Sequence, residues 1–175
     1  MIYDKTYLRK KFLLQRKKKH FKPKKFKFNL IFKLIKKYFS KKKIIIGGYY
    51  PSYYEVDILN FLEEASRKKH KIVLPVIKSP KAMSFKSWTF NEPLYVNKFG
   101  MLEPKNSNKN ITPDLIMVPL VAFDSWLNRI GYGKGYYDRS LQNIVRNKKI
   151  VSIGIAFSFQ KSSRIPVNKN DFKLD

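Results

Sequence analysis

The residues best suited to chemistry lie in the segment NRIGYGKGYYDRSL, residues 128–141. The chain has seven glycines, and three of them lie close together in this segment: Gly131, Gly133 and Gly135. Glycine permits positive φ values and lets a ligand approach the backbone, so successive N–H groups can face one anion. Arg129 could contact a phosphate through two N–H groups, and Lys134 could add a mobile positive charge. We therefore predict a phosphate-binding loop.

The segments on either side of the loop are typical of such a site. The apolar run at 114–123 predicts a strand buried on both faces, and a helix is expected at about 136–147. A helix that begins at the loop would add its free N–H groups to the anion site. The G-x-G-x-G spacing matches neither the Walker nor the dinucleotide motif, so a plain glycine turn is the alternative. Asp138 beside bound phosphates suggests Mg²⁺; otherwise it caps the helix or pairs with Arg139.

Hydrophobic spacing elsewhere alternates between helix and strand. Helices are expected at 3–20, 26–39 and 55–70, and strands at 43–51, 71–77 and 149–157. A loop-rich region is expected at about 78–113, with one or two short strands such as 94–99. The first two helices should bury Tyr7, Leu8, Phe12 and Leu14, and Leu30, Ile31, Leu34, Ile35 and Tyr38. This order predicts an α/β fold with a largely parallel central sheet. We expect a single domain over 1–175, with a lysine-rich helical region at about 3–39.

Composition narrows the classes of partner. The formal charge is +26. One hypothesis is therefore a nucleic-acid-binding module that binds through residues 3–39. Only seven of the 38 basic residues are arginine, however, and arginine is the preferred reader of bases and phosphates. We therefore expect no specific nucleic acid and a small anionic ligand instead. There is no cysteine, and His20 and His70 lie far apart among lysines, which argues against a zinc site. No apolar run is long enough for a membrane helix, and a cytoplasmic monomer is expected.

The segment RIGYGKGYYDR resembles the signature of the 5-formyltetrahydrofolate cyclo-ligase family. Further segments resemble that family in its order along the chain, from about Lys5 to Asp175: YLRK, YYPSYYEVDIL, KIVLPVI, MSFKSW, NKFGMLEP, DLIMVPLVAFD and IPVNKNDFKLD. The resemblance implies ATP-dependent and Mg²⁺-dependent closure of 5-formyltetrahydrofolate to 5,10-methenyltetrahydrofolate, with release of ADP and phosphate. It also implies a three-layer α/β fold related to sugar-isomerase and CoA-transferase-like proteins. A folate-binding protein without catalysis is a further alternative.

The resemblance also assigns roles to residues of this chain. Arg129 and Lys134 would be catalytic. ATP phosphates would be bound by Lys5, Arg9 and the loop formed by Arg129, Ile130, Gly131, Tyr132, Gly133, Lys134, Gly135, Tyr136 and Tyr137. Mg²⁺ would be held by Asp138 and Asp171. The folate, whose tail can carry several glutamates, would be bound by Ser52, by Glu55 or Asp57, and by Tyr132, Gly133, Lys134, Gly135 and Tyr136.

Four aromatic side chains could form walls for a flat ligand, although ordinary core packing is the alternative for each: Tyr49, Phe85, Trp88 and Phe123. Two positions differ from the family's pattern. Ile58 stands where threonine often follows Glu-Val-Asp, and Leu127 stands where a turn glycine is common.

Overall fold

The computed structural model describes residues 4–19, 28–39 and 43–175. Its helices are α1 (Lys5–Lys19), α2 (Asn29–Phe39), α3 (Leu59–Arg67) and α4 (Tyr136–Val145), with a short 3₁₀ turn at Ser158–Gln160. Its strands are β1 (Ile45–Gly47), β2 (Lys71–Ser79), β3 (Ala82–Ser87), β4 (Tyr95–Val96), β5 (Leu102–Glu103), β6 (Leu115–Pro119), β7 (Ala122–Phe123), β8 (Arg129–Ile130) and β9 (Val151–Ile155). Strands and helices thus alternate as the hydrophobic spacing predicts.

The central sheet has the order β3-β2-β1-β6-β9. All neighbouring strands are parallel except β2 and β3, which form an antiparallel pair at the edge. The prediction of a largely parallel sheet is therefore confirmed. Strand β6 is buried on both faces, because Leu115 and Met117 pack on one side of the sheet while Ile116 and Val118 pack on the other. Such burial explains why this strand is apolar at every position.

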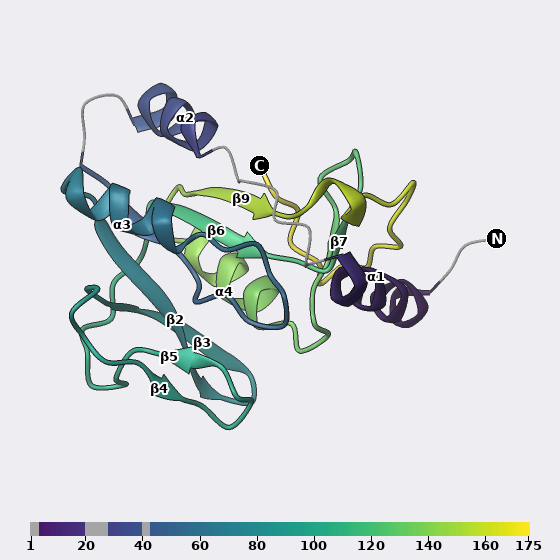
Figure 1. Cartoon of the computed structure of the whole chain (residues 1–175), viewed down its shortest axis with the longest axis horizontal. Coiled ribbons are helices and arrows are strands. Elements are labelled where there is room, and N and C mark those ends of the chain that lie inside the picture. The colour runs from purple at the N-terminus through teal and green to yellow at the C-terminus, as the bar shows by residue number, and fades with distance from the viewer. Residues whose placement is uncertain (1–3, 20–27, 40–42) are drawn as a thin grey trace.

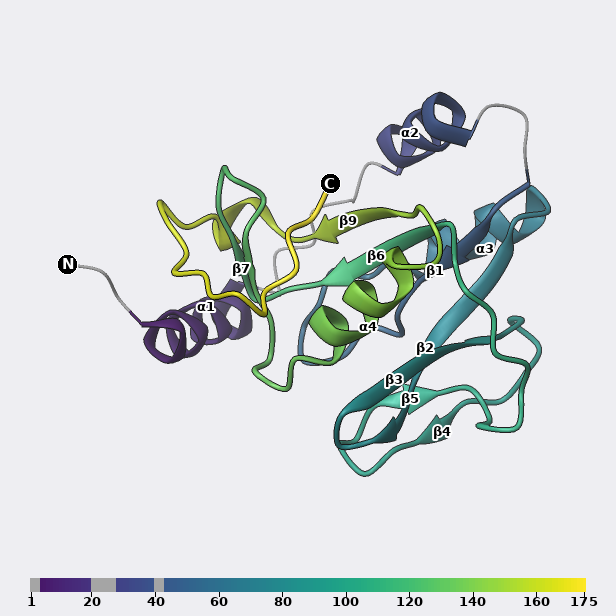
Figure 2. The same cartoon turned by 180° about the vertical axis from the view of Figure 1, so that it is seen from behind.

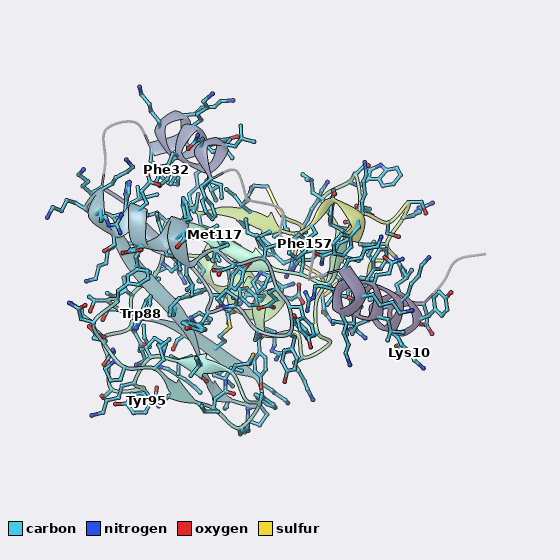
Figure 3. The ribbon with its side chains drawn as sticks, in the orientation of Figure 1. Lys10, Phe32, Trp88, Tyr95, Met117 and Phe157 are labelled. Atoms are coloured by element: carbon cyan, nitrogen blue, oxygen red, sulfur yellow. The ribbon has the colours of Figure 1, made fainter. Side chains whose placement is uncertain are left out.

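Helices cover the sheet in three layers. Helices α2 and α3 pack on one face, through side chains such as Ile35 and Leu62 around Met117, which is labelled near the centre of Figure 3. Helix α4 packs on the opposite face through Leu141. Accordingly α3 lies nearer the viewer in Figure 1, and α4 lies nearer in Figure 2. The expected three-layer α/β arrangement is confirmed.

Helix α1 lies at one end of the molecule and packs on the β7–β8 hairpin (Figure 1). Asp4 caps the start of the helix, accepting a hydrogen bond from the Tyr7 backbone N–H at 2.7 Å. Leu8 and Phe12 are buried against Val121 and Ile130. This contact fixes the N-terminal helix beside the strand that leads into the glycine loop.

Some expectations about the helices were wrong. Only Leu8 and Phe12 of the first predicted stripe are buried, whereas Tyr7 and Leu14 are exposed. In α2 the buried residues are Ile31 and Ile35, and the predicted Leu30 and Tyr38 are exposed. Each helix fully buries about one residue per turn, and partly buried neighbours such as Leu13 and Phe32 widen the contact without reaching the exposed positions. Positions 3, 20, 26 and 27 of the predicted helices lie outside the described residues.

The region at 78–113 contains β4 within the short strand that was expected at 94–99, and two further strands, β3 and β5. Strand β3 extends the central sheet, and β4 and β5 pair as a separate antiparallel hairpin. The third helix is shorter than predicted: residues 55–58 precede it, and α3 begins at Leu59. None of the helices in the described part of the chain is long and apolar enough to cross a bilayer.

Candidate active site

A cavity of about 730 Å³ opens at the carboxyl ends of the parallel strands. Its walls come from the segment after β1, the second half of β2, the start of β3, the β4–β5 hairpin, the end of β6, the glycine loop, the first half of α4, the start of α1 and residues 168–171. This edge is where ligands generally bind in open α/β sheets. Helix α1 and the β4–β5 hairpin lie on opposite sides of α4 in both views (Figures 1 and 2).

The glycine loop runs along this cavity from β8 to α4. Gly133 and Gly135 have φ values of 91° and 64°, which glycine adopts without steric cost. A Cβ on Gly131 would meet nothing within 4 Å, so the backbone at this position is open to a ligand. Gly135 is also the N-cap of α4, and no side chain caps that end of the helix. The free N–H groups of the first turn can therefore contribute to anion binding.

Two basic residues of α1 line the cavity, and Arg9 reaches the glycine loop. Arg9 donates from Nε to the Gly131 carbonyl at 2.8 Å, and a Cβ on Gly133 would lie 3.2 Å from the Arg9 guanidinium carbon. The Lys5 ammonium pairs with Asp171. Lys134 is exposed on the loop itself, with its ammonium 6.0 Å from the centre of the Phe99 ring. The structure thus places Lys5, Arg9 and Lys134 on one cavity, from distant parts of the sequence.

Arg129 is almost fully buried, and much of its guanidinium group is already used by the protein. It pairs with Asp138 at 2.6 Å and donates to the Phe172 carbonyl. Burial lowers the pKa of Arg129, and the nearby carboxylates of Asp138 and Asp171 oppose that change. Asp138 therefore pairs with Arg129 and not with Arg139, which donates to the Lys81 and Lys134 carbonyls instead. In this arrangement Arg129 braces the start of α4 against the C-terminal segment.

Asp138 and Asp171 offer oxygen ligands at the same cavity. Asp138 Oδ1 accepts from Arg129 and from the Phe172 backbone N–H, whereas Asp171 Oδ2 accepts from Lys5 and from the Asn168 N–H. One oxygen of each carboxylate has no hydrogen-bond donor among the described residues. No group of three or more metal-binding side chains occurs in residues 4–19, 28–39 and 43–175. A pair of carboxylates beside phosphates nevertheless fits Mg²⁺, which commonly takes one or two carboxylates and fills its other positions with phosphate oxygens and water.

Glu55 lies on the cavity wall at the centre of a hydrogen-bond network. Its Oε2 accepts from the Ser52 backbone N–H at 2.9 Å, and its Oε1 accepts from the Tyr132 hydroxyl at 2.7 Å. Burial raises the pKa of Glu55, and the hydrogen bonds from Tyr132 and Ser52 together with the positive charge of Arg16 oppose the rise. Asp57, by contrast, lies outside the cavity and accepts a hydrogen bond from the Leu59 N–H at the start of α3.

The hydroxyl of Tyr137 is buried and has no hydrogen-bond partner among the described residues, although the side chain lines the cavity. Burial raises the pKa of this hydroxyl, so it stays protonated and can donate. A buried donor without a partner is costly, by about 1–3 kcal/mol. A ligand atom that accepts from Tyr137 would remove this cost.

Of the four aromatic candidates, only Tyr49 lines the cavity. Trp88, labelled in Figure 3, is buried in the core shared with α2 and α3. Phe85 and Phe123 pack in the core on the other side of the sheet. For these three residues the alternative prediction, ordinary core packing, is therefore confirmed.

Sequence reasoning missed the apolar end of the cavity. This end is formed by side chains from β2, β3 and the β4–β5 hairpin: Pro75, Ile77, Met83, Phe99, Met101 and Leu102. The buried carboxylate of Glu103 holds the hairpin in place by accepting from the Ile77 N–H at 3.1 Å and the Asn97 amide at 2.7 Å. The sequence shows apolar residues in the region at 78–113, but their presence does not reveal that they line one side of a cavity.

The chain is similar to known proteins over nearly its whole length. The profile of the 5-formyltetrahydrofolate cyclo-ligase family matches residues 2–175. The chain belongs to this family. A 5-formyltetrahydrofolate cyclo-ligase from Haemophilus influenzae is 32% identical over 126 residues, which cover 69% of this chain and 67% of that protein.

Two solved structures of 5,10-methenyltetrahydrofolate synthetases share the fold. The Aquifex aeolicus protein has a TM-score of 0.70 and 31% identity, over 98% of this chain and 87% of its own. The Mycoplasma pneumoniae protein has a TM-score of 0.71 and 27% identity, over 99% of this chain and 96% of its own. The cyclo-ligase family match therefore includes the glycine loop, Glu55 and the C-terminal segment that meet at the cavity.

Proposed function

We propose that this protein uses ATP to convert 5-formyltetrahydrofolate to 5,10-methenyltetrahydrofolate, releasing ADP and phosphate. The observation that carries the proposal is the joint lining of one cavity by Lys5 and Arg9, the glycine loop and an apolar wall. A triphosphate needs the two cations and the glycine loop, and a pterin ring needs the apolar wall. Membership of the cyclo-ligase family supports the same assignment.

The glycine loop, Lys5, Arg9 and Lys134 form the triphosphate end in this proposal. The N–H groups of the loop and of the first turn of α4 face the phosphate oxygens, and the three cations neutralise their charge. Asp138 and Asp171 would hold Mg²⁺, which when bound would neutralise further phosphate charge. Arg129 acts mainly by fixing Asp138, because its guanidinium group already pairs with that carboxylate.

The pterin binds against the apolar wall, with Glu55 accepting hydrogen bonds from its N–H groups. Glu55 is the better candidate than Asp57, because only Glu55 lines the cavity. Ser52 holds the Glu55 carboxylate in place through its backbone N–H. The buried hydroxyl of Tyr137 would donate to an oxygen of the bound ligands.

The reaction needs positioning and charge neutralisation, and no protein nucleophile. The formyl oxygen on N5 attacks the γ-phosphorus, and the bond from that phosphorus to the β–γ bridging oxygen breaks to release ADP. The phosphorylated formyl carbon is then attacked by N10, which loses its proton. Its carbon–oxygen bond breaks, phosphate leaves and the five-membered ring closes. Lys134 and the loop N–H groups stabilise the negative charge on the phosphoryl group as it transfers.

An absorbance assay tests this function. The purified protein is mixed with 5-formyltetrahydrofolate, and formation of the methenyl product is followed by its ultraviolet band with and without ATP and Mg²⁺. We expect product only when ATP is present, with one ADP formed for each product molecule. Binding of the folate without ATP consumption would instead identify a folate-binding protein that lacks catalysis.

A further inference from the structure

Arg16 of α1 is only 1% exposed, yet it forms no direct ion pair with a carboxylate of the described residues. Its two terminal nitrogens donate to neutral oxygens, the Leu120 carbonyl at 3.3 Å and the Tyr132 hydroxyl. Its Nε is buried and has no partner among the described residues. Because a buried charge without an opposite charge is costly, this guanidinium group calls for a nearby anion.

The anion closest to Arg16 through hydrogen bonds is Glu55. The Tyr132 hydroxyl accepts from Arg16 and donates to Glu55 Oε1, so its single proton completes a chain from cation to carboxylate. The Arg16 guanidinium carbon also lies 5.5 Å from the centre of the Tyr132 ring, which adds a cation–π contact. Burial and the nearby negative charge of Glu55 raise the pKa of Tyr132, so the phenol keeps the proton that it donates.

We propose that Arg16 is a positioning residue whose charge, transmitted through the Tyr132 hydroxyl, fixes the place and the ionised state of Glu55 on the cavity wall. This inference rests on the proposed function only in giving Glu55 a role in folate binding. Arg16 itself does not line the cavity and so touches neither ligand. Its effect passes from α1, through the glycine loop, to the segment after β1.

Four groups from different elements face Glu55 and can affect its ionisation. They are Arg16 of α1, Tyr132 of the glycine loop, Tyr137 of α4 and Tyr49 after β1. Arg16 is the only cation among them. Burial raises the pKa of Glu55, and Arg16 and Tyr132 act in the opposite direction. Removing either one should therefore leave Glu55 protonated up to a higher pH.

A substrate-free NMR titration tests this inference independently of the proposed function. The protein is labelled at the glutamate side-chain carboxyl carbons, and the Glu55 signal is assigned by its loss in Glu55→Gln. In Arg16→Met, which keeps much of the side-chain volume, the midpoint of the Glu55 titration should move to higher pH. In Lys10→Met, which removes an exposed charge from the same helix (labelled in Figure 3), the midpoint should not move. A midpoint in Arg16→Met equal to that of the wild type would overturn the proposal.

Tyr132→Phe provides a second variant that removes one oxygen and leaves the buried Arg16 in place. It should move the Glu55 midpoint in the same direction, because it removes a hydrogen bond that Glu55 accepts directly. In the double variant the combined shift should differ from the sum of the two single shifts, because Arg16 and Tyr132 belong to one hydrogen-bond chain. If Arg16→Met does not fold, as judged by circular dichroism, Tyr132→Phe alone decides: an unmoved midpoint rejects the inference.

An activity measurement then separates positioning from structural support. If the wild type turns over, kcat/KM of Tyr132→Phe and Arg16→Met for the folate should fall at least about fivefold more near pH 6 than near pH 8. Arg16→Lys, which keeps the charge, should recover part of the loss. A loss equal at both pH values would mean that Arg16 only supports the fold. A wild type without turnover would refute the proposed function, while the NMR titration would still decide the role of Arg16.

Discussion

The glycine loop and the cations of α1 line one part of the cavity, which we call its triphosphate end, and apolar side chains from β2, β3 and the β4–β5 hairpin line another, its apolar end. The two parts meet where the Lys134 ammonium lies 6.0 Å from the centre of the Phe99 ring. The first end depends on backbone conformation, set by Gly133 and Gly135. The second depends on the packing of a two-stranded hairpin that a single buried carboxylate, Glu103, ties to β2. The two ends should therefore respond differently to substitution.

The largest effect is expected for Glu55→Gln. Glutamine offers one acceptor where the carboxylate offers two, and its amide donor would face the N–H groups of the pterin. We expect kcat/KM for the folate to fall about 100-fold, with the KM for ATP nearly unchanged. Asp57→Asn is the matched control, because asparagine can still cap α3. Steady-state rates with each substrate varied in turn provide the measurement, and the opposite pattern would assign the pterin contact to Asp57.

The next largest effect is expected for Lys134→Ala at the triphosphate end. Loss of one cation that stabilises the transferring phosphoryl group should lower kcat at least about tenfold without changing thermal stability. Lys105→Ala, in an exposed loop outside the cavity, should keep the wild-type rate. A wild-type rate for Lys134→Ala, measured by the absorbance assay, would remove this lysine from the mechanism.

A smaller effect is expected for Met101→Ala at the apolar end. The substitution removes contact area from the wall, so the KM for the folate should rise about fivefold while the KM for ATP stays constant. Val96→Ala on the same hairpin is the control, since Val96 is exposed and outside the cavity. If both KM values rise together, the two ends are coupled and the contrast between them is wrong.

The smallest expected effect is the pH dependence of the wild type. Burial raises the pKa of Glu55 above its ordinary value of 4.5, so the carboxylate is ionised only above the raised value. Since the ionised carboxylate binds the pterin, kcat/KM for the folate should rise as pH increases through this pKa and fall as acid protonates Glu55. The KM for ATP should be flat over the same range. An acid limb that persists unchanged in Glu55→Gln would show that another group causes it.

Sequence reasoning located the glycine loop because its signal is local. Glycines spaced by two, between an apolar strand and an amphipathic helix, specify a loop conformation within a few residues. It could not show that Arg129 already pairs with Asp138 or that Tyr132 links Arg16 to Glu55, because both contacts depend on how distant elements pack. The apolar wall was missed for a further reason. Strands β4 and β5 are only two residues long, so their sequence shows no alternation of apolar and polar residues.

The aromatic candidates show a related limit. All four candidates are large aromatic residues, yet only Tyr49 lines the cavity, whereas Trp88, Phe85 and Phe123 do not. An apolar side chain is stabilised equally by a core or by a ligand wall, and residue type alone does not distinguish the two. By contrast, the fold class was predictable, because the alternation of apolar strands with helical spacing extends over most of the chain.

The ion pair between Lys5 and Asp171 joins positions 166 residues apart, and Arg9 meets Gly131 across 122 residues. Contacts of such high sequence separation form late, because a long loop must close before they bring any gain. The two contacts therefore make the cavity depend on both ends of the chain at once. ATP that binds there should slow unfolding and leave the folding rate unchanged, because the ligand binds only after both ends are in place.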